Sequence, residues 1–257
     1  MIFDKYIAHR GITNNAPENT FLAFNKTYEL GISWVEVDVQ LSKDGIPVIF
    51  HDYDLNKLCG DKSIITDLSL DEIKKCSVLF NGYNHFNECI PTLDEYLTWM
   101  MSKPNIHTNL EIKVKPYVDN QYELRLVQVV LDVIKRFPTL RSRLLFSSFS
   151  LHVLDQLRKL SSSIYIGMLL EFKTNMGWDD FFKLCEKNYF KVYSKLNCIV
   201  LGINVEYLYQ KHINQIRSYC PTILGYSNVK LTSNDADRLI GLGYTSIFID
   251  SVVNNDE

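Results

Sequence analysis

The sequence lacks the features that mark secreted and membrane-spanning proteins. Its six cysteines are scattered, with no C-x-x-C pair, no zinc-type spacing and no dense framework, which is typical of reduced thiols in a cytosolic protein. No apolar run is long enough to span a bilayer, and the N-terminus has no basic segment followed by an apolar one. These absences predict a cytoplasmic protein without stable membrane insertion.

Excess positive charge is also missing. There are 27 Lys and Arg residues against 30 Asp and Glu residues, so the net charge is −3. A protein that binds nucleic acid or an anionic membrane needs clustered Lys and Arg, and this chain has no such excess. We therefore expect no nucleic-acid partner, and any recognition of phosphate must be local to a small-molecule site. The sequence does not indicate an oligomeric state.

The 257 residues contain 46% hydrophobic residues, enough for a sizeable core, and no repeats or low-complexity linkers divide them. We expect one domain over residues 1–257. Short β-branched runs alternate with helical patterns, which predicts repeated βα units and a parallel sheet. The predicted strands are 6–8, 34–39 together with 47–50, 108–112, 144–147, 164–169, 198–201, 222–225 and 246–249.

Eight strand-helix units are the number found in a TIM (β/α)8 barrel, although a doubly wound sheet shows the same alternation. Polar residues favour the barrel, because several follow the C-terminal ends of predicted strands, where barrel strands converge on one face. Residues 53–89 interrupt the rhythm after the second strand and predict a small insertion, with a short helix at 67–74. Asn19 is the expected N-cap of the helix that carries Phe21 and Phe24, and Ser233 is expected before the last helix.

Three carboxylates follow two neighbouring strands. Glu36 and Asp38 are two residues apart in a strand, so their side chains point to the same side of the sheet, and Glu111 ends the next strand. A lone E-x-D is usually an exposed pair, but here apolar residues flank it, and unpaired buried carboxylates cost several kcal/mol. A divalent cation removes that cost, and oxygen ligands suit Mg²⁺, Ca²⁺ or Mn²⁺.

Two histidines, His9 and His51, each follow an apolar strand and precede another polar residue. Imidazole titrates near neutrality, so we expect one to accept a proton while the other donates one. The remaining histidines have no such setting and are expected to be structural: His85, His107, His152 and His212.

Several polar neighbours have two possible roles. Arg10 offers a forked donor to phosphate oxygens and Lys113 a second cation, although either fits a salt bridge at the barrel mouth. Glu18 and Asn19 either orient Arg10 and the metal ligands or serve a local structural purpose. Asp52 either orients His51 or opens the next loop.

The order and spacing of these motifs resemble the glycerophosphodiester phosphodiesterase family, which is related to phosphatidylinositol-specific phospholipase C barrels. The matching motifs are His9-Arg10-Gly11, Pro17-Glu18-Asn19-Thr20, Glu36-Val37-Asp38, His51-Asp52, I-P-T-L-D-E at 90–95 and L-L-F-S-S-F at 144–149. The resemblance implies a divalent-cation-dependent hydrolysis of glycerophosphodiesters to glycerol 3-phosphate and an alcohol. The attacking group is then water or the glycerol 2-hydroxyl of the substrate.

The C-terminal third departs from the family pattern. The chain has G-Y-S-N at 225–228 where members often carry W-T-V-N, and Ile249-Asp250 where T-D is usual. Tyr226 therefore replaces an indole as the expected platform for substrate, and the released alcohol is not encoded in any motif.

Three other functions fit parts of the sequence. A phospholipase of the same barrel superfamily requires an exposed apolar rim, for which the insertion offers Leu79, Phe80, Tyr83 and Phe86. A phosphodiesterase that acts on a glycerophosphate-containing surface polymer differs only in its substrate. A non-catalytic binding module is disfavoured by the complete set of site residues.

Overall fold

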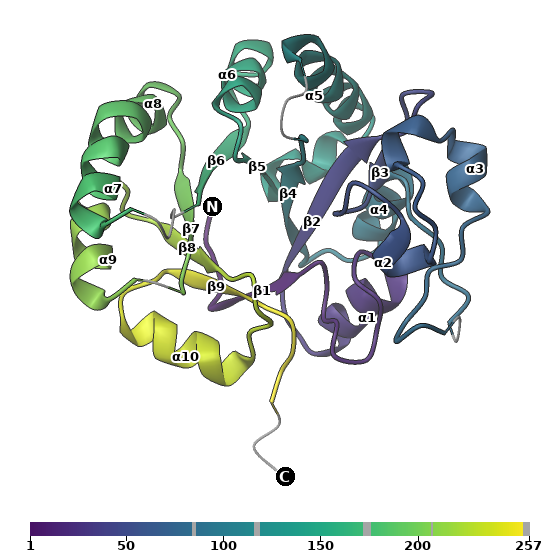
Figure 1. Cartoon of the computed structure of the whole chain (residues 1–257), viewed down its shortest axis with the longest axis horizontal. Coiled ribbons are helices and arrows are strands. Elements are labelled where there is room, and N and C mark those ends of the chain that lie inside the picture. Colours follow the sequence, from purple (N-terminus) through teal and green to yellow (C-terminus); the bar gives the residue numbers. More distant parts are fainter. Residues whose placement is uncertain (84–85, 116–118, 172–175, 207, 254–257) are drawn as a thin grey trace.

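The computed structural model describes residues 1–83, 86–115, 119–171, 176–206 and 208–253. Within these residues eight parallel strands form a closed ring, because β1 pairs with both β2 and β9 (Figure 1). The ring contains, in spatial order, β1 (Tyr6–His9), β9 (Ser246–Ile249), β8 (Ile223–Tyr226), β7 (Val200–Asn204), β6 (Tyr165–Leu170), β5 (Leu144–Ser148), β4 (His107–Ile112) and β2 (Trp34–Leu41). The predicted TIM barrel is confirmed.

The ninth described strand lies outside the ring. Strand β3 (Pro47–Ile49) pairs antiparallel with β2, so that Val39 lies opposite Ile49 and Leu41 opposite Pro47. The sequence pattern placed the runs 34–39 and 47–50 in one strand-helix unit. The structure shows that β3 pairs with the C-terminal end of β2 and so adds a strand to the sheet outside the ring.

Helices surround the ring (Figure 1). They are α1 (Phe21–Glu29), α4 (Leu93–Met101), α5 (Asn120–Lys135), α6 (Leu151–Leu160), α7 (Trp178–Leu184), α8 (Phe190–Lys195), α9 (Gln210–Arg217) and α10 (Ser233–Gly241). A 3-10 helix over Pro138–Arg143 joins α5 to β5, and a π-helical turn over Cys185–Tyr189 joins α7 to α8. No helix among the described residues combines the length and hydrophobicity needed to cross a bilayer.

Two predicted helix caps are wrong by one residue. Thr20, not Asn19, is the N-cap of α1, and its side chain accepts a hydrogen bond from the backbone of Ala23. An N-cap needs extended backbone, which Thr20 has, whereas Asn19 has a left-handed φ of 55°. Thr232 likewise caps α10, and Ser233 is its first residue, because the Thr232 hydroxyl and Asp235 form a capping box.

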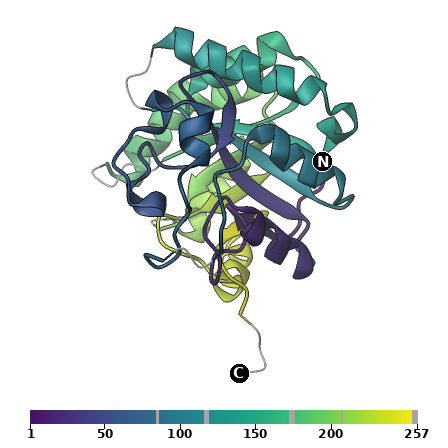
Figure 2. The same cartoon turned by 90° about the vertical axis from the view of Figure 1, so that its right-hand side faces the viewer.

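The insertion folds beside β2 and β3, at the right of Figure 1, and faces the viewer in Figure 2. It contains α2 (Asn56–Cys59), a 3-10 turn (Ile65–Asp67) and α3 (Leu70–Lys74). The helix expected at 67–74 is therefore shorter than predicted, because Ser69 and Glu72 form a capping box that starts α3 at Leu70. The insertion has a small apolar core of its own, here called the insertion core, made of Val48, Phe50, Leu55, Leu58, Ile65, Ile73, Val78 and Ile90.

Candidate active site

A cavity of about 360 Å³ opens at the C-terminal ends of the ring strands. Its lining includes most of the site residues expected from the sequence: His9, Arg10, Glu18, Glu36, His51, Glu111, Lys113 and Tyr226. Asp38, Asn19 and Asp52 lie behind this lining and contact residues that form it. Among these expected residues, His9 and Tyr226 are the farthest apart in the sequence, and the barrel brings both to one cavity.

Strand register places the three carboxylates beside one another. Asp38 on β2 lies opposite Glu111 on β4, and Glu36 lies opposite His9 on β1. One oxygen from each of Glu36, Asp38 and Glu111 lies within 4.8 Å of the others. All three residues are buried, with Glu36 and Asp38 only 2% and 1% exposed. Because Glu36 and Asp38 are two residues apart in an extended strand, both side chains point to the same side of β2.

The pKa values of the two carboxylates on β2 shift in opposite directions. Burial, together with the neighbouring charges of Asp38 and Glu111, raises the pKa of Glu36 well above its ordinary value. Burial also opposes ionisation of Asp38, but the charges of His51, Lys113 and Arg10 outweigh it and lower its pKa. Among the described residues none donates a hydrogen bond to the buried Oδ1 of Asp38, and Lys113 Nζ lies 3.5 Å from it. Three carboxylates gathered at one point fit a hard divalent cation.

Lys113 already acts as a cation beside this group. Its Nζ lies 3.2 Å from Glu111 Oε1 and 3.5 Å from Asp38 Oδ1. Burial tends to lower the pKa of Lys113, but the charges of Glu111 and Asp38 raise it above its ordinary value. The ion pairs expected as one alternative are therefore present, and Lys113 and Glu111 also line the cavity.

Arg10 is held by its backbone and by two carboxylates. It has a left-handed φ of 59°, and its backbone N–H donates to Glu36 Oε2 at 3.1 Å. Its Nη1 donates to Glu18 Oε1 at 2.7 Å, and its Nε lies 3.4 Å from Asp38 Oδ2. A left-handed non-glycine residue costs about 1–3 kcal/mol, so the surrounding contacts must over-determine this conformation.

Asn19 supports the same arrangement from the neighbouring loop. Its backbone N–H donates to the carbonyl of Arg10 at 2.9 Å, and its side-chain Nδ2 donates to Asp38 Oδ2 at 3.1 Å. Gly11 allows the loop to approach α1, since a Cβ at this position would lie 2.7 Å from Ala23 Cβ. Of the two roles expected for Asn19, the contact geometry matches the one beside the carboxylates.

Each of the two histidines is paired with a carboxylate through Nδ1. His51 Nδ1 lies 2.6 Å from Asp52 Oδ1, and His9 Nδ1 lies 3.3 Å from Asp250 Oδ1. A carboxylate at Nδ1 favours the tautomer with the proton on that nitrogen, which leaves Nε2 free to accept a proton. Asp250 is itself held, because its Oδ2 accepts a hydrogen bond from the backbone of Leu231 at 2.9 Å.

The family model described as the glycerophosphoryl diester phosphodiesterase family matches residues 9–254. The chain belongs to this family. A glycerophosphodiester phosphodiesterase of Caldanaerobacter subterraneus subsp. tengcongensis is 33% identical over 166 residues, which are 64% of this chain and 66% of that relative. The matched segment thus spans slightly less than two thirds of that relative's length.

Solved structures of similar proteins cover nearly the whole chain. An Oleispira antarctica phosphodiesterase, in complex with its product sn-glycerol-3-phosphate, is 28% identical with a TM-score of 0.81, covering 96% of this chain and 93% of that one. A Thermotoga maritima glycerophosphodiester phosphodiesterase is 26% identical with a TM-score of 0.69, covering 97% and 96%. The resemblance read from short motifs is therefore confirmed as family membership, and these structures share the barrel fold.

Two charged residues of this family member were missed by the sequence interpretation. Asp250 directly follows the last strand, the same signal that identified His9 and Glu111, and it was noted only as part of a departure from the family pattern. Lys57 lies on α2 of the insertion and also lines the cavity, where its Nζ is 2.5 Å from Glu18 Oε2. Nothing in the local sequence pattern connects Lys57 to the strand ends.

Apolar and aromatic residues from the part of the barrel between β5 and β9 form another wall of the cavity. Tyr226 packs edge-on against Phe149 with ring centroids 5.7 Å apart, and its hydroxyl donates to the carbonyl of Leu170. Leu169 and Phe248 complete this wall, and Phe248 stacks on the imidazole of His9. The hydroxyl of Tyr226 is thus bonded to the main chain, and the side chain lines the cavity.

The other described histidines lie outside this cavity of the family member. His107 stacks on Trp34, His212 stacks on Trp178, and His152 Nδ1 lies 2.6 Å from Glu123 Oε2. His85 lies outside the described residues. The structural role expected for these histidines stays a prediction.

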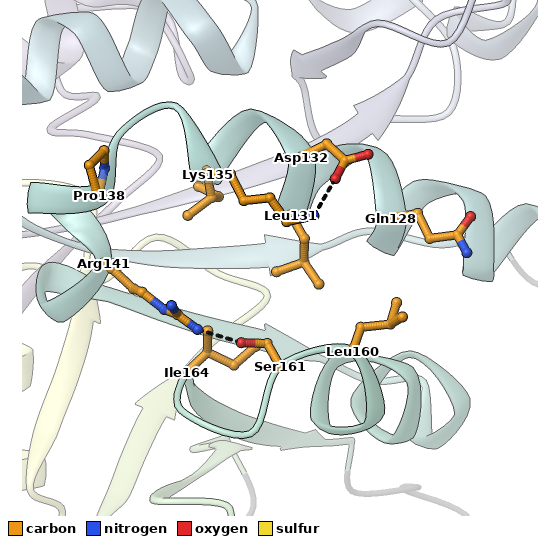
Figure 3. Close-up of a pocket in the computed structure, with 10 residues that line it drawn as sticks. Gln128, Leu131, Asp132, Lys135, Pro138, Arg141, Leu160, Ser161 and Ile164 are labelled. Atoms are coloured by element: carbon orange, nitrogen blue, oxygen red, sulfur yellow. Dashed lines mark hydrogen bonds and ion pairs between the residues drawn. The ribbon is translucent and has the colours of Figure 1, made fainter.

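A larger cavity of about 530 Å³ lies between α5 and α6 (Figure 3). Its lining includes Pro138 and Ile164, which precede β5 and β6, so it opens toward the N-terminal ends of the strands. Its carboxylate, Asp132, is ion-paired with Lys135, and Arg141 donates to Ser161. The smaller cavity, which contains the histidines and the carboxylates, is therefore the candidate active site, and it lies at the C-terminal face where the active sites of such barrels are found.

Proposed function

We propose that this chain hydrolyses glycerophosphodiesters to glycerol 3-phosphate and an alcohol and requires a divalent cation. The observation that carries the proposal is the single cavity in which two carboxylate-paired histidines, His9 and His51, adjoin the three buried carboxylates. Family membership and the product named for the similar Oleispira antarctica structure support the same substrate class.

Glu36, Asp38 and Glu111 would hold the cation, which we propose to be Mg²⁺, Ca²⁺ or Mn²⁺. When bound, such an ion supplies Lewis-acid polarisation of a phosphate oxygen. Arg10 and Lys113 face the same space and neutralise charge on the remaining phosphate oxygens. Glu18 and Asn19 hold Arg10 and Asp38 in place for this purpose.

His9 and His51 carry the proton transfers. One accepts the proton of the attacking hydroxyl at Nε2, and the other donates a proton to the departing alkoxide. Asp250 and Asp52 orient the two rings and stabilise whichever becomes an imidazolium. Tyr226 forms the wall against which the substrate packs.

The direct test is release of glycerol 3-phosphate from a glycerophosphodiester with and without chelator. We expect turnover that chelation abolishes and that Mg²⁺, Mn²⁺ or Ca²⁺ restores. Turnover that persists in excess chelator would contradict the cation requirement, and turnover of phosphodiesters generally, with no preference for the glycerol group, would contradict the substrate class.

We further propose that the glycerol 2-hydroxyl is the nucleophile. Its proximity to phosphorus supplies an effective molarity worth as much as about 7 to 11 kcal/mol, which external water lacks. The 2-deoxy analogue is then expected to bind without being hydrolysed, and a cyclic glycerophosphate is expected to appear transiently with the normal substrate. Hydrolysis of the analogue at a comparable rate would show attack by water.

Among the other functions considered, a phospholipase acting on intact lipids needs an exposed apolar rim. In the described part of the insertion Tyr83 and Phe86 are exposed, whereas Leu79 and Phe80 are half-buried. Tyr53 and Ile64 of the insertion are also exposed, at 39% and 41%, so four such side chains are available to the rim that a phospholipase requires. Binding to phosphatidylcholine vesicles would favour the phospholipase. The surface-polymer substrate shares the proposed chemistry and would be distinguished by comparing turnover of the polymer and the small diester.

We also propose that residues 1–257 act as one domain in the cytoplasm. Val48 and Phe50, in and directly after β3, belong to the insertion core, so the insertion packs directly on the sheet. The six cysteines are unpaired, in keeping with a reducing compartment. A single cooperative unfolding transition and cell fractionation test these two statements.

A further inference from the structure

Glu18 is shared by two cations that come from different parts of the chain. Its Oε1 accepts from Nη1 of Arg10, in the loop after β1, at 2.7 Å. Its Oε2 lies 2.5 Å from Nζ of Lys57, on α2 of the insertion. The Glu18 side chain is largely buried, at 13% exposure, and so is that of Arg10, whereas the Lys57 side chain is 54% exposed. Burial raises the pKa of Glu18, but the charges of Arg10 and Lys57 outweigh it and keep the pKa below its ordinary value.

The position of Lys57 controls how Glu18 meets Arg10. An arginine and a carboxylate left to themselves favour a bidentate pair with two parallel N–H···O bonds. Here Lys57 takes the second oxygen, so Glu18 holds Arg10 through one nitrogen only. The Nε of Arg10 is buried and lies 3.4 Å from Asp38 Oδ2, so it faces that carboxylate. No hydrogen bond between described residues uses Nη2 of Arg10, which leaves this nitrogen as a donor for a phosphate oxygen in the cavity that Arg10 lines.

The insertion core sets the position of Lys57. Leu55 and Leu58 flank it and are buried in that core, at 0% and 7% exposure. The backbone N–H of Asn56 donates to Asp54 Oδ1, and Gly60 ends the helix with a left-handed φ of 69°. The short helix α2 therefore holds Lys57 next to Glu18, because the residues that flank Lys57 are buried in the insertion core.

We propose that Lys57 is a positioning residue through which the insertion, acting on Glu18, holds Arg10 ready for the substrate phosphate. The inference rests on the proposed function, because it takes the phosphate of a glycerophosphodiester as the group that Arg10 binds. It makes the insertion a working part of the active site, whereas the sequence indicated only an added segment at the catalytic face.

The test is a double-mutant cycle between Lys57 and Glu18. We expect Lys57→Met to lower kcat/KM about tenfold, mostly by raising KM, because Arg10 contacts the phosphate before and during the reaction. Lys57→Arg should recover activity to within about threefold of wild type, since it restores a cation at Oε2. Lys62→Met, in the same insertion but outside the cavity lining, is the matched control and should change neither constant. In a Glu18→Gln background, Lys57→Met should change kcat/KM less than twofold.

The same cycle measured on the Kd for glycerol 3-phosphate gives a readout independent of turnover. If wild type binds glycerol 3-phosphate but releases none from a diester, the proposed function fails, and the Kd cycle still decides the role of Lys57. An undiminished loss from Lys57→Met in the Glu18→Gln background would show that Lys57 acts without Glu18 and would overturn the proposal. A loss no larger than that of Lys62→Met, a fall in kcat alone, or no binding by wild type would overturn it as well.

Discussion

The two halves of the barrel contribute unequally to the candidate site. The half that contains β1, β2 and β4, with the loops that follow them, supplies His9, Arg10, Glu36, Asp38, His51, Glu111 and Lys113. The half from β5 to β9 supplies mainly the wall, formed by Phe149, Leu169, Tyr226 and Phe248, and adds Asp250. The residues of the proposed chemistry are thus concentrated on three neighbouring strands and their loops, while the rest of the ring contributes mainly an apolar wall.

Strand pairing explains this concentration. Strand β2 lies between β1 and β4, so its inward carboxylates meet those neighbours directly, as Asp38 meets Glu111. Buried carboxylates require partners within hydrogen-bond or coordination distance, and here adjacent strands and the loops that follow them provide these partners. The strands of the other half turn apolar side chains such as Leu169 and Phe248 toward the cavity, and these need no such partners.

The largest expected effect is at the carboxylates of the first half. Glu36→Gln should lower kcat at least about 10³-fold at saturating Mg²⁺, Mn²⁺ or Ca²⁺, because a Lewis acid is worth several kcal/mol of transition-state stabilisation. Tyr226→Phe, in the other half, is the control, because it keeps the aromatic ring that lines the cavity. Full activity of Glu36→Gln in excess chelator would contradict the proposal that the first half of the barrel supplies a cation site.

The histidines should show the next largest effect. His9→Ala and His51→Ala should each lower kcat by about 10² to 10⁴ without changing the thermal unfolding midpoint substantially. The double mutant should lose less than the sum of the two free energies, since the residues act as one unit. Near wild-type turnover in either single mutant would assign that histidine a structural role.

Asp250 tests whether the second half contributes to the chemistry at all. Asp250→Asn and Asp52→Asn should each lower kcat about tenfold to a hundredfold with little change in KM, as for other residues that orient a site through a hydrogen bond. Asp250→Glu keeps the charge and serves as the matched variant. An effect on KM alone would show that Asp250 affects substrate binding and does not orient His9 for proton transfer.

Asp250 also predicts a dependence of stability on pH. Burial raises the pKa of Asp250, but contacts with His9 and with the Leu231 backbone outweigh it, so the folded-state pKa lies below its ordinary value. The folded state therefore binds fewer protons, and the stabilisation is present above the unfolded pKa of about 3.9 and lost as pH falls through the folded value. Urea unfolding from pH 7 to pH 3 should show the difference between wild type and Asp250→Asn shrinking toward acid. A constant difference would contradict this assignment.

The wall should give the smallest effect on rate. Phe149→Ala should change the ratio of kcat/KM between two glycerophosphodiesters with different alcohols by less than about tenfold, near the low end of what an apolar pocket discriminates. Its kcat for the better substrate should stay within a few-fold of wild type. A loss comparable to that of His9→Ala would show that the second half does more than form an apolar wall.

Much of this arrangement was accessible from the sequence because it follows from strands. Glu36, Asp38 and Glu111 were found from the two-residue period and from positions at strand ends, and the ring confirmed their proximity. The errors occurred where backbone conformation decides. The left-handed φ of Asn19 turns its amide toward Asp38 and leaves the capping role to Thr20.

Lys57 shows what sequence patterns do not contain. Its partner Glu18 is 39 residues away, and their contact depends on how the insertion core packs around Leu55 and Leu58. No period or motif reports on the packing of an irregular segment, so this contact required the three-dimensional structure. Asp250 differs, because the strand-end signal was present and only its pairing with His9 was missed.

The closure of β1 against β9 has a consequence for the order in which the protein is made. Pairs such as Tyr6 with Ile247 and the contact of His9 with Asp250 join positions 241 residues apart. During translation the first strand leaves the ribosome long before the last one exists, so one histidine stays without its carboxylate until synthesis of β9. Until then β1 and β8 each present an unpaired edge, the type of surface on which neighbouring nascent chains associate. Newly made protein should therefore depend on protection of these edges until β9 has been synthesised.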